Sequence, residues 1–390
     1  MRSARIARLA RESFLEEPLM EGFTDIRKKP VIALRTILMS LYLMPFFSMT
    51  SLLSNDRMAR TKRYRRLFGC RRKMVASDST FARVLGWLKY QEVQRFLLRF
   101  LKMFEQRDML RKRLCEGGRL RRLGVLDGSY MGGHWQVTLC LPGKIAYPVM
   151  LRGYRKRGKE LEAARELMRD APGVLGKARP ELWLLDALYF NTATIEIARE
   201  QQAHVLFKFK KTDLRTVTKD AQNLFEHYGG DEEQSGFDTE RLCRWWVRKT
   251  EEKFHSEYPV QVVELVERYV KRKQNRNTRC WIVSTDLELS LEEIREAAHQ
   301  RWQVENNVFK RISHLSGTKR FYFRDPKRFF TLLHILYAGM AMLDYIMALL
   351  KDHPLVFAAL RGGIKPTWRN VCSQIQEVLY GLSAALVRVT

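Results

Sequence analysis

The amino-acid sequence predicts an α/β core between two helical regions. Short apolar runs typical of buried strands occupy the middle of the chain, where they alternate with segments of helical periodicity. A second group of strand-like runs interrupts this pattern between residues 211 and 286. The 390 residues suffice to bury a large core divided into two or three domains. We expect a helical region at 1–116, a core at 117–316 and a second helical region at 317–390.

Residues 1–116 show the periodicity of several short helices. An apolar helix is expected around 31–47, and a basic stretch follows at 57–73. The cap cluster 77–80 opens the next helix, and a long amphipathic helix is expected over 91–113. Short helices with basic flanks are typical of DNA-binding regions, but a plain helical bundle with solvated charges explains the same pattern. Both interpretations stay open.

The core is predicted to begin with three antiparallel strands, followed by a helix, a strand, a second helix and a fifth strand. Pro142-Gly143 marks the turn between the second and third strands. This order is typical of a ribonuclease H-like α/β fold, in which the first and fourth strands lie side by side. The expected ranges are 121–131, 135–141, 145–152, 159–171 (helix), 182–187, 192–202 (helix) and 205–210.

Two acidic residues stand at the far ends of short apolar runs in these strands. Asp127 follows the run 123–126, and Asp186 follows the run 182–185. Aspartate is depleted in strands and costs free energy at a buried strand end unless something there needs its charge. Each one alone is also explained by a helix N-cap or a turn. Because the first and fourth strands are expected to be neighbours, we expect the two carboxylates to lie close together.

A third acid, Glu305, is predicted to lie on the buried face of a later helix. Ser290 and Glu293 form the pattern of a capping box, and Gly317 closes the segment. Burying an unpaired carboxylate costs several kcal/mol, so Glu305 should be paired, neutralised or bound to a metal. An i, i+4 ion pair with Arg301 is the simplest alternative. At about 100° per residue, the residues within roughly 60° of Glu305 are Ile294, Ala298, Trp302, Val308, Phe309 and Ile312.

Residues 211–286 are predicted to form a β-rich insertion in the core, with strands at 242–248, 260–267 and 279–284. Partial alternation of apolar and polar residues indicates a half-exposed sheet. Trp245 and Trp246 should point to opposite faces, so one belongs to the core and the other either packs or stacks on an unpaired base. On the strand before the insertion, Lys208 and Lys210 alternate outward and either line a DNA channel or are solvated.

The chain is strongly basic, with 70 Lys and Arg against 43 Asp and Glu, a formal charge of +27 and a pI near 10.0. Such an excess indicates a polyanionic partner. Basic runs recur at 57–66, 111–113, 152–157 and 268–273. Their spread favours double-stranded DNA over one small ligand.

Cysteine usage and hydropathy predict a cytoplasmic protein without a membrane partner. The six cysteines show no CxxC pair and no zinc-type spacing, which is typical of reduced thiols. The basic N-terminus is not followed by an apolar signal core. The apolar stretches 36–54 and 329–350 are expected to be buried helices, with membrane insertion as the open alternative. Asp344 would be costly at the middle of a bilayer.

The motifs resemble those of the DDE transposases of bacterial insertion sequences, particularly the cut-and-paste group with a β-strand insertion before the last acid. The resemblance covers about residues 75–345. The family signature also places a Tyr three residues before its Arg and a Lys seven residues after its Glu, where this chain has Ala298 and Ile312. Lys310 and Arg311 stand near the latter position. The motifs that carry the resemblance are Leu126-Asp127-Gly-Ser, Asp186-Ala-Leu-Tyr-Phe and Arg301-Trp-Gln-Val-Glu305-Asn-Asn-Val-Phe-Lys310.

The resemblance implies metal-dependent DNA cleavage at transposon ends, followed by strand transfer into target DNA. It implies two Mg²⁺ or Mn²⁺ ions, with Asp127 bridging both, Asp186 holding one and Glu305 the other. Arg301 either orients Glu305 or touches the scissile-strand phosphate, and Lys310 and Arg311 are expected at the DNA. Paired-end cutting implies a homodimer on DNA. The resemblance also implies a protein associated with the bacterial nucleoid. The alternatives are a ribonuclease H-like nuclease or resolvase, and an inactive, domesticated DNA-binding protein.

Overall fold

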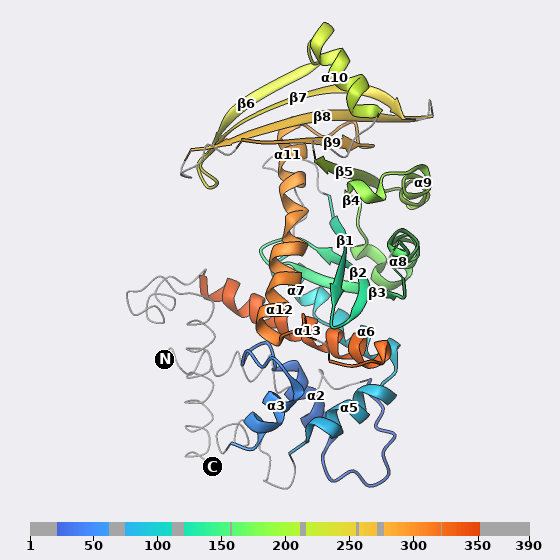
Figure 1. The fold of residues 1–390 in the computed structure, drawn as a ribbon, viewed down its shortest axis with the longest axis vertical. Helices are drawn as coiled ribbons and strands as arrows, with labels where there is room; N and C mark the ends of the chain where they lie inside the picture. The colour runs from blue at the N-terminus through green and yellow to red at the C-terminus, as the bar shows by residue number, and fades with distance from the viewer. Residues whose placement is uncertain are drawn as a thin grey trace.

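A nine-stranded mixed sheet forms the centre of the computed structural model (Figure 1), in the order β3-β2-β1-β4-β5-β9-β8-β7-β6. Helices pack on both faces of the sheet, so the predicted α/β class is confirmed. The predicted start of the core at residue 117, the basic run 111–113 and the chain beyond 351 lie outside the described residues. The structure describes residues 22–61, 75–110, 121–156, 158–210, 216–254, 257–270, 277–320 and 322–351.

The first five strands follow the predicted order. Strands β1, β2 and β3 are antiparallel, whereas β4 pairs in parallel with both β1 and β5. Val125 of β1 lies opposite Leu184 of β4, so the predicted neighbours are confirmed. The apolar runs before the two aspartates are fully buried because both faces of these strands are covered. The strands are β1 (Leu123–Met131), β2 (His134–Leu141), β3 (Tyr147–Tyr154), β4 (Leu182–Asp186) and β5 (His204–Lys210).

The strands of the insertion continue the same sheet. Strand β9 pairs antiparallel with β5, and β8, β7 and β6 follow outward. The three predicted insertion strands are present, while β6 and α10 were not predicted from the sequence. The boundaries at 116 and 316 stay predictions. The elements are α10 (Val217–His227), β6 (Glu232–Asp238), β7 (Cys243–Phe254), β8 (Tyr258–Tyr269) and β9 (Asn277–Ser284).

Two layers of helices enclose the core sheet. Helices α8 (Glu160–Leu175) and α9 (Thr192–Glu200) lie on one side in Figure 1. The run of α11 (Leu291–Gln300), the π-helix η5 (Val304–Phe309) and α12 (Lys310–Ser316) lies on the other. The predicted capping box at Ser290 is confirmed, and so is the end at Gly317, which has φ 63°. The predicted single helix therefore contains a π-helical segment around Glu305.

The N-terminal helices and α13 form a helical layer below the sheet in Figure 1. Two helices, α6 and α7, stand where one long helix was predicted. The chain bends at Phe100, whose buried ring stacks against Tyr42 and Phe104. This tertiary packing outweighs the helical periodicity of the segment. The elements are α2 (Leu34–Tyr42), α3 (Leu52–Ala59), α5 (Asp78–Trp87), α6 (Tyr90–Leu98), α7 (Leu101–Gln106) and α13 (Pro326–Lys351).

Helix α13 packs closely on the sheet. Gly132 and Gly153 face the rings of Phe329 and Phe330, and an added Cβ would come within 2.2 Å and 2.0 Å of those rings. Asp344 of α13 is buried and ion-paired with Arg311. Within the described ranges, no helix is both long and apolar enough to cross a membrane.

Candidate active site

The two strand-end aspartates meet at a single guanidinium group. Nη1 of Arg301 lies 3.8 Å from Oδ2 of Asp127 and 4.0 Å from Oδ2 of Asp186. The parallel pairing of β1 with β4 brings the two carboxylates to the same face of the sheet, against the α11–η5 run. Arg301 is only 8% exposed. Its inward position makes it the cation that partly balances both acids.

Asp127 is poorly stabilised as an anion. Its pKa is raised to about 7, chiefly by burial and also by the neighbouring Asp186 and Glu160, although Arg301 and the Gly128 N–H act in the opposite direction. The Gly128 N–H donates to Oδ1 over 2.9 Å. A carboxyl group whose pKa is raised by burial and like charge becomes a much better anion when a second cation arrives.

Glu160, at the start of α8, is a site residue that sequence reasoning missed. Its carboxylate accepts hydrogen bonds from Tyr189 Oη at 2.6 Å and from Tyr154 Oη at 2.9 Å. It also lies directly against Gly128, where an added Cβ would come within 2.2 Å of Glu160 Oε1. The glycine after Asp127 is therefore needed to admit Glu160. The Asp-Gly pair was visible in the sequence, but nothing there connected it to Glu160.

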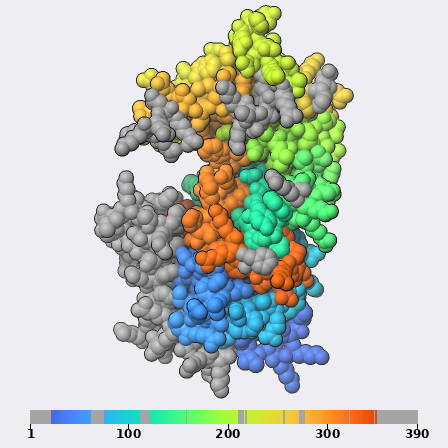
Figure 2. All heavy atoms as spheres, in the orientation of Figure 1, coloured from blue at the N-terminus to red at the C-terminus, as the bar shows by residue number. Residues whose placement is uncertain are grey.

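The predicted burial of Glu305 is wrong. Its side chain is 52% exposed and pairs with Lys310 at 3.1 Å, and Trp302, expected on the same buried face, is 49% exposed. The buried stripe is centred on Arg301, Val304 and Val308, which places Glu305 and Trp302 at its solvent edge. Figure 2 shows the run from α11 to α12 at the molecular surface, between the insertion and the N-terminal helices. In place of the alternative i, i+4 pair, Arg301 faces the two aspartates and Glu305 pairs with Lys310.

Lys208 lies beside the aspartates instead of pointing freely outward. Its Nζ donates to the Ala298 carbonyl at 3.2 Å and stands 5.0 Å from the centre of the Trp302 ring. Burial lowers the pKa of Lys208, with Arg301 acting in the same direction. Lys208 is therefore part of the wall behind Asp186. For Lys210 only the backbone is described, paired with Cys280 across β5 and β9.

The two insertion tryptophans point to opposite faces, as predicted. Arg295 of α11 stands over Trp245 at 5.0 Å, and Arg248 stands over Trp246 at 4.8 Å. Both indoles are half-buried, so neither presents a fully open ring. The idea that one of them stacks on an unpaired base stays a prediction.

Arg311 forms an ion pair with the buried Asp344 of the helical layer. Its side chain is 16% exposed, and the expected contact of Arg311 with DNA stays a prediction. The physical reason for the ion pair is the charge of Asp344, which needs a partner inside the helical layer. Lys310 is exposed and contacts Glu305 and Asn306, so it remains accessible.

Asp127 and Asp186 suit a divalent cation by the chemistry of their donors. Carboxylate oxygens are the ligands that Mg²⁺ and Mn²⁺ prefer, and Mg²⁺ keeps several waters and needs few protein ligands. Across the described residues, however, no three His, Cys, Asp or Glu side chains are gathered closely enough to hold a metal ion. Glu305 therefore does not join the aspartates in this conformation. Two of the three predicted metal ligands are brought together, and the third is not.

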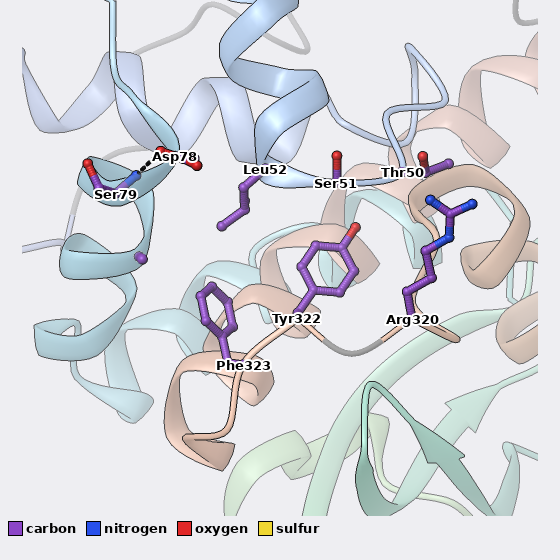
Figure 3. A pocket seen from close by; sticks show the side chains of 9 residues that line it. Thr50, Ser51, Leu52, Asp78, Ser79, Arg320, Tyr322 and Phe323 are labelled. Atoms are coloured by element: carbon purple, nitrogen blue, oxygen red, sulfur yellow. Dashed lines mark hydrogen bonds between the residues drawn. The ribbon is translucent and has the colours of Figure 1, made fainter.

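A separate cavity of about 350 Å³ lies between the N-terminal helices and the segment after α12. Figure 3 shows Ser51 at the start of α3, Asp78 at the start of α5 and Arg320 around it, with the Ser79 N–H donating to Asp78. Neither aspartate of the candidate site lines this cavity. Its lining combines hydroxyl, charged and apolar side chains.

Comparisons with known proteins add little to this geometry. No protein-family model and no curated protein matches the chain. Among solved structures, the fold is similar to that of the piggyBac transposase in a synaptic complex with hairpin DNA. The TM-score is 0.44, with 10% sequence identity over 99% of this chain and 81% of that chain. At this level of similarity the match carries no functional argument.

Proposed function

We propose that this chain is a DDE transposase of a bacterial insertion sequence, built on a ribonuclease H-like core. It would cut DNA at transposon ends by metal-dependent phosphodiester cleavage and join the freed 3′ ends to target DNA. One observation carries the proposal: Asp127 and Asp186, from adjacent parallel strands, face the arginine of the Arg301-to-Glu305 signature. The alternation of strands and helices before this signature supports the same assignment.

Asp127 and Asp186 are the residues that would hold Mg²⁺ or Mn²⁺. When bound, a pair of such ions supplies charge stabilisation for both the attacking and the leaving oxygen of a phosphodiester. Arg301 supplies a fixed positive charge at the same place, where it can also contact a phosphate. Lys208 lies opposite Asp186 in the sheet and contacts Trp302, whose exposed indole is accessible to DNA.

Glu305 would complete the site after a local change. It lies on η5, which packs beside β1, and its present partner is the exposed Lys310. An exposed ion pair is worth little, about 0–1 kcal/mol, so exchanging Lys310 for a metal costs little. π-Helical segments are rare and occur frequently at functional sites. DNA, whose phosphates attract Lys310, would release Glu305 toward the aspartates.

The strong positive charge supports duplex DNA as the partner. A formal charge of +27 greatly exceeds what solubility requires, and each phosphate neutralised by Lys or Arg releases counterions. A homodimer on DNA is proposed because cutting two transposon ends together requires two active sites. The cytoplasmic, nucleoid-associated location follows from the same proposal.

Cleavage of DNA that carries the inverted repeats flanking the coding region tests the function. With Mg²⁺, the wild type should nick the repeat ends and produce strand-transfer products with a target plasmid. Asp127→Asn and Asp186→Asn should lose cleavage while DNA affinity stays within a few-fold. Glu200→Gln, an exposed acid at the end of α9, is the matched control and should keep full activity.

Three results would redirect the proposal. Cleavage without strand transfer would favour a ribonuclease H-like nuclease or resolvase. Specific binding without any cleavage by the wild type would favour a domesticated DNA-binding protein. Full cleavage by Asp127→Asn would remove that residue from the active site.

A further inference from the structure

The insertion sheet has an outer face that points away from the candidate active site. On β7, Cys243 and Trp245 face α11, where Arg295 contacts both. The alternate residues Arg244, Trp246 and Arg248 therefore face the side of α10. Figure 1 shows α11 against one face of these strands and α10 against the other.

Helix α10 covers only part of this outer face. Its Phe225 stacks on Trp281 of β9 with ring centres 6.0 Å apart, and Arg248 lies 4.4 Å from the Phe225 ring centre. In the strand register, these contacts lie two rows away from Arg244. The end of the face formed by the last residues of β6 and β8 lies beyond α10.

Three side chains form a row across that end of the face. Phe237 of β6 lies opposite Arg244 of β7, which in turn lies opposite Arg268 of β8. Directly opposed residues share a face of the sheet, so all three project outward. Phe237 is 50% exposed, and both arginines are exposed. We call these three residues the outer row.

The two arginines of the outer row lie directly opposite each other on β7 and β8. No ion pair of Arg244 or Arg268 occurs within the part of the chain that the structure describes. The neighbouring Arg248 and Arg279 both pair with Glu264. This carboxylate is buried and already has these two partners. Like charges directly opposite each other destabilise a sheet, so this pair has a cost that the fold does not need.

We propose that the outer row binds an unpaired DNA strand. Arg244 and Arg268 would contact successive phosphates, and the Phe237 ring would stack on a base. The proposal rests on the proposed function only for the identity of the nucleic acid. The surface itself is separate from the aspartates, because it lies on the far side of the sheet from α11.

The residue types favour a single strand over a duplex. A half-exposed phenyl ring can stack on a base only when that base is unpaired, and aromatic rings beside arginines are the usual platform for single strands. A duplex is read by an element that enters a groove, whereas the outer row lies flat on a sheet. An acidic protein would satisfy the arginines but gives no role to Phe237.

Binding of fluorescent oligothymidylate of about 16 nucleotides, measured by anisotropy in EDTA, tests the proposal. EDTA removes cleavage, so the result does not depend on the active site. Phe237→Ala should weaken single-strand binding by about 5- to 150-fold and leave binding of a duplex of equal length within twofold. Arg244→Gln and Arg268→Gln should each lower the slope of log affinity against log salt by about 0.7.

Arg169→Gln is the matched control, because Arg169 is an exposed arginine on α8, distant from the insertion. Thermal midpoints should be unchanged or higher in Arg244→Gln and Arg268→Gln, since each removes a repulsion. Single-strand binding by Phe237→Ala and Arg244→Gln that equals Arg169→Gln would overturn the proposal. So would an equal loss of duplex and single-strand binding in Phe237→Ala. Loss of cleavage in Asp127→Asn with normal single-strand binding would show that the outer row binds single strands independently of the active site.

Discussion

Nη1 of Arg301 lies 3.8 Å from Oδ2 of Asp127, at the place where the sequence predicts metal ions. The guanidinium is a partial substitute for such an ion, because it is also within 4.0 Å of Asp186. The compensation is incomplete, since burial still holds the pKa of Asp127 at about 7. The structure therefore contains a pair of acids with too little positive charge beside it.

The pH dependence of stability should change in Asp127→Asn. The Asp127 pKa is raised from 3.8 to about 7, so the folded state binds more protons than the unfolded state between these values. Stability contributed by this group is then lost as pH rises through that window. In EDTA, the thermal midpoint of Asp127→Asn should exceed that of the wild type at pH 8 and approach it at pH 4. Parallel pH profiles for the two proteins would contradict the raised pKa.

Arg311→Ala should destabilise the protein strongly. Removing this guanidinium breaks a buried ion pair with Asp344, which typically costs about 3–5 kcal/mol. Adding Asp344→Asn should restore part of the loss, because the buried charge is then gone. Urea unfolding of the single and double variants measures this coupling.

Glutamine variants of Lys310 and Arg311 separate a structural role from a DNA-binding role. Lys310→Gln should lower the salt slope of duplex binding by about 0.9, whereas Arg311→Gln should not change it. An equal change of slope in both variants would show that Arg311 also contacts DNA.

Glu160→Ala should lower the free energy of unfolding, because Glu160 supports the candidate site through its hydrogen bonds. It leaves the hydroxyl groups of Tyr189 and Tyr154 without their acceptor, and an unsatisfied buried donor costs about 1–3 kcal/mol. Glu160→Gln keeps an acceptor oxygen and should lose less. In a double-mutant cycle, Tyr189→Phe should cost less in the Glu160→Ala background than in the wild type. Strict additivity would show that the hydrogen bond at 2.6 Å has no energetic role.

Trp302→Ala should leave folding nearly unchanged and weaken DNA binding. The indole is 49% exposed and contacts Lys208 through its ring face, so its removal opens no large cavity. If the ring stacks on a base next to the cut, affinity for a substrate with an unpaired base there should fall about 5- to 150-fold. Trp302→Phe should recover most of this loss. Wild-type affinity in Trp302→Ala would exclude the contact.

The sequence predicts the strand order around Asp127 and Asp186 well, because apolar runs, turn residues and strand neighbours are local or topological signals. The burial of Glu305 was predicted wrongly, because helical periodicity cannot tell which of several nearby charged residues faces the core. Arg301 takes that position, since it has two acids to pair with. The role of Arg311 depends on Asp344, and that of Glu160 depends on Gly128. Both roles arise from contacts between segments distant in the sequence, so local patterns could not predict them.

The most direct test of the account is Mn²⁺ binding, measured by electron paramagnetic resonance with cleavage-resistant DNA present. The account predicts tight Mn²⁺ binding by the wild type, loss of that binding in Asp127→Asn and Asp186→Asn, and weakened binding in Glu305→Gln. Without DNA, Glu305→Gln should bind Mn²⁺ as the wild type does, because Glu305 then pairs with Lys310. Mn²⁺ binding by Asp127→Asn and Asp186→Asn that equals the wild type would contradict the central claim.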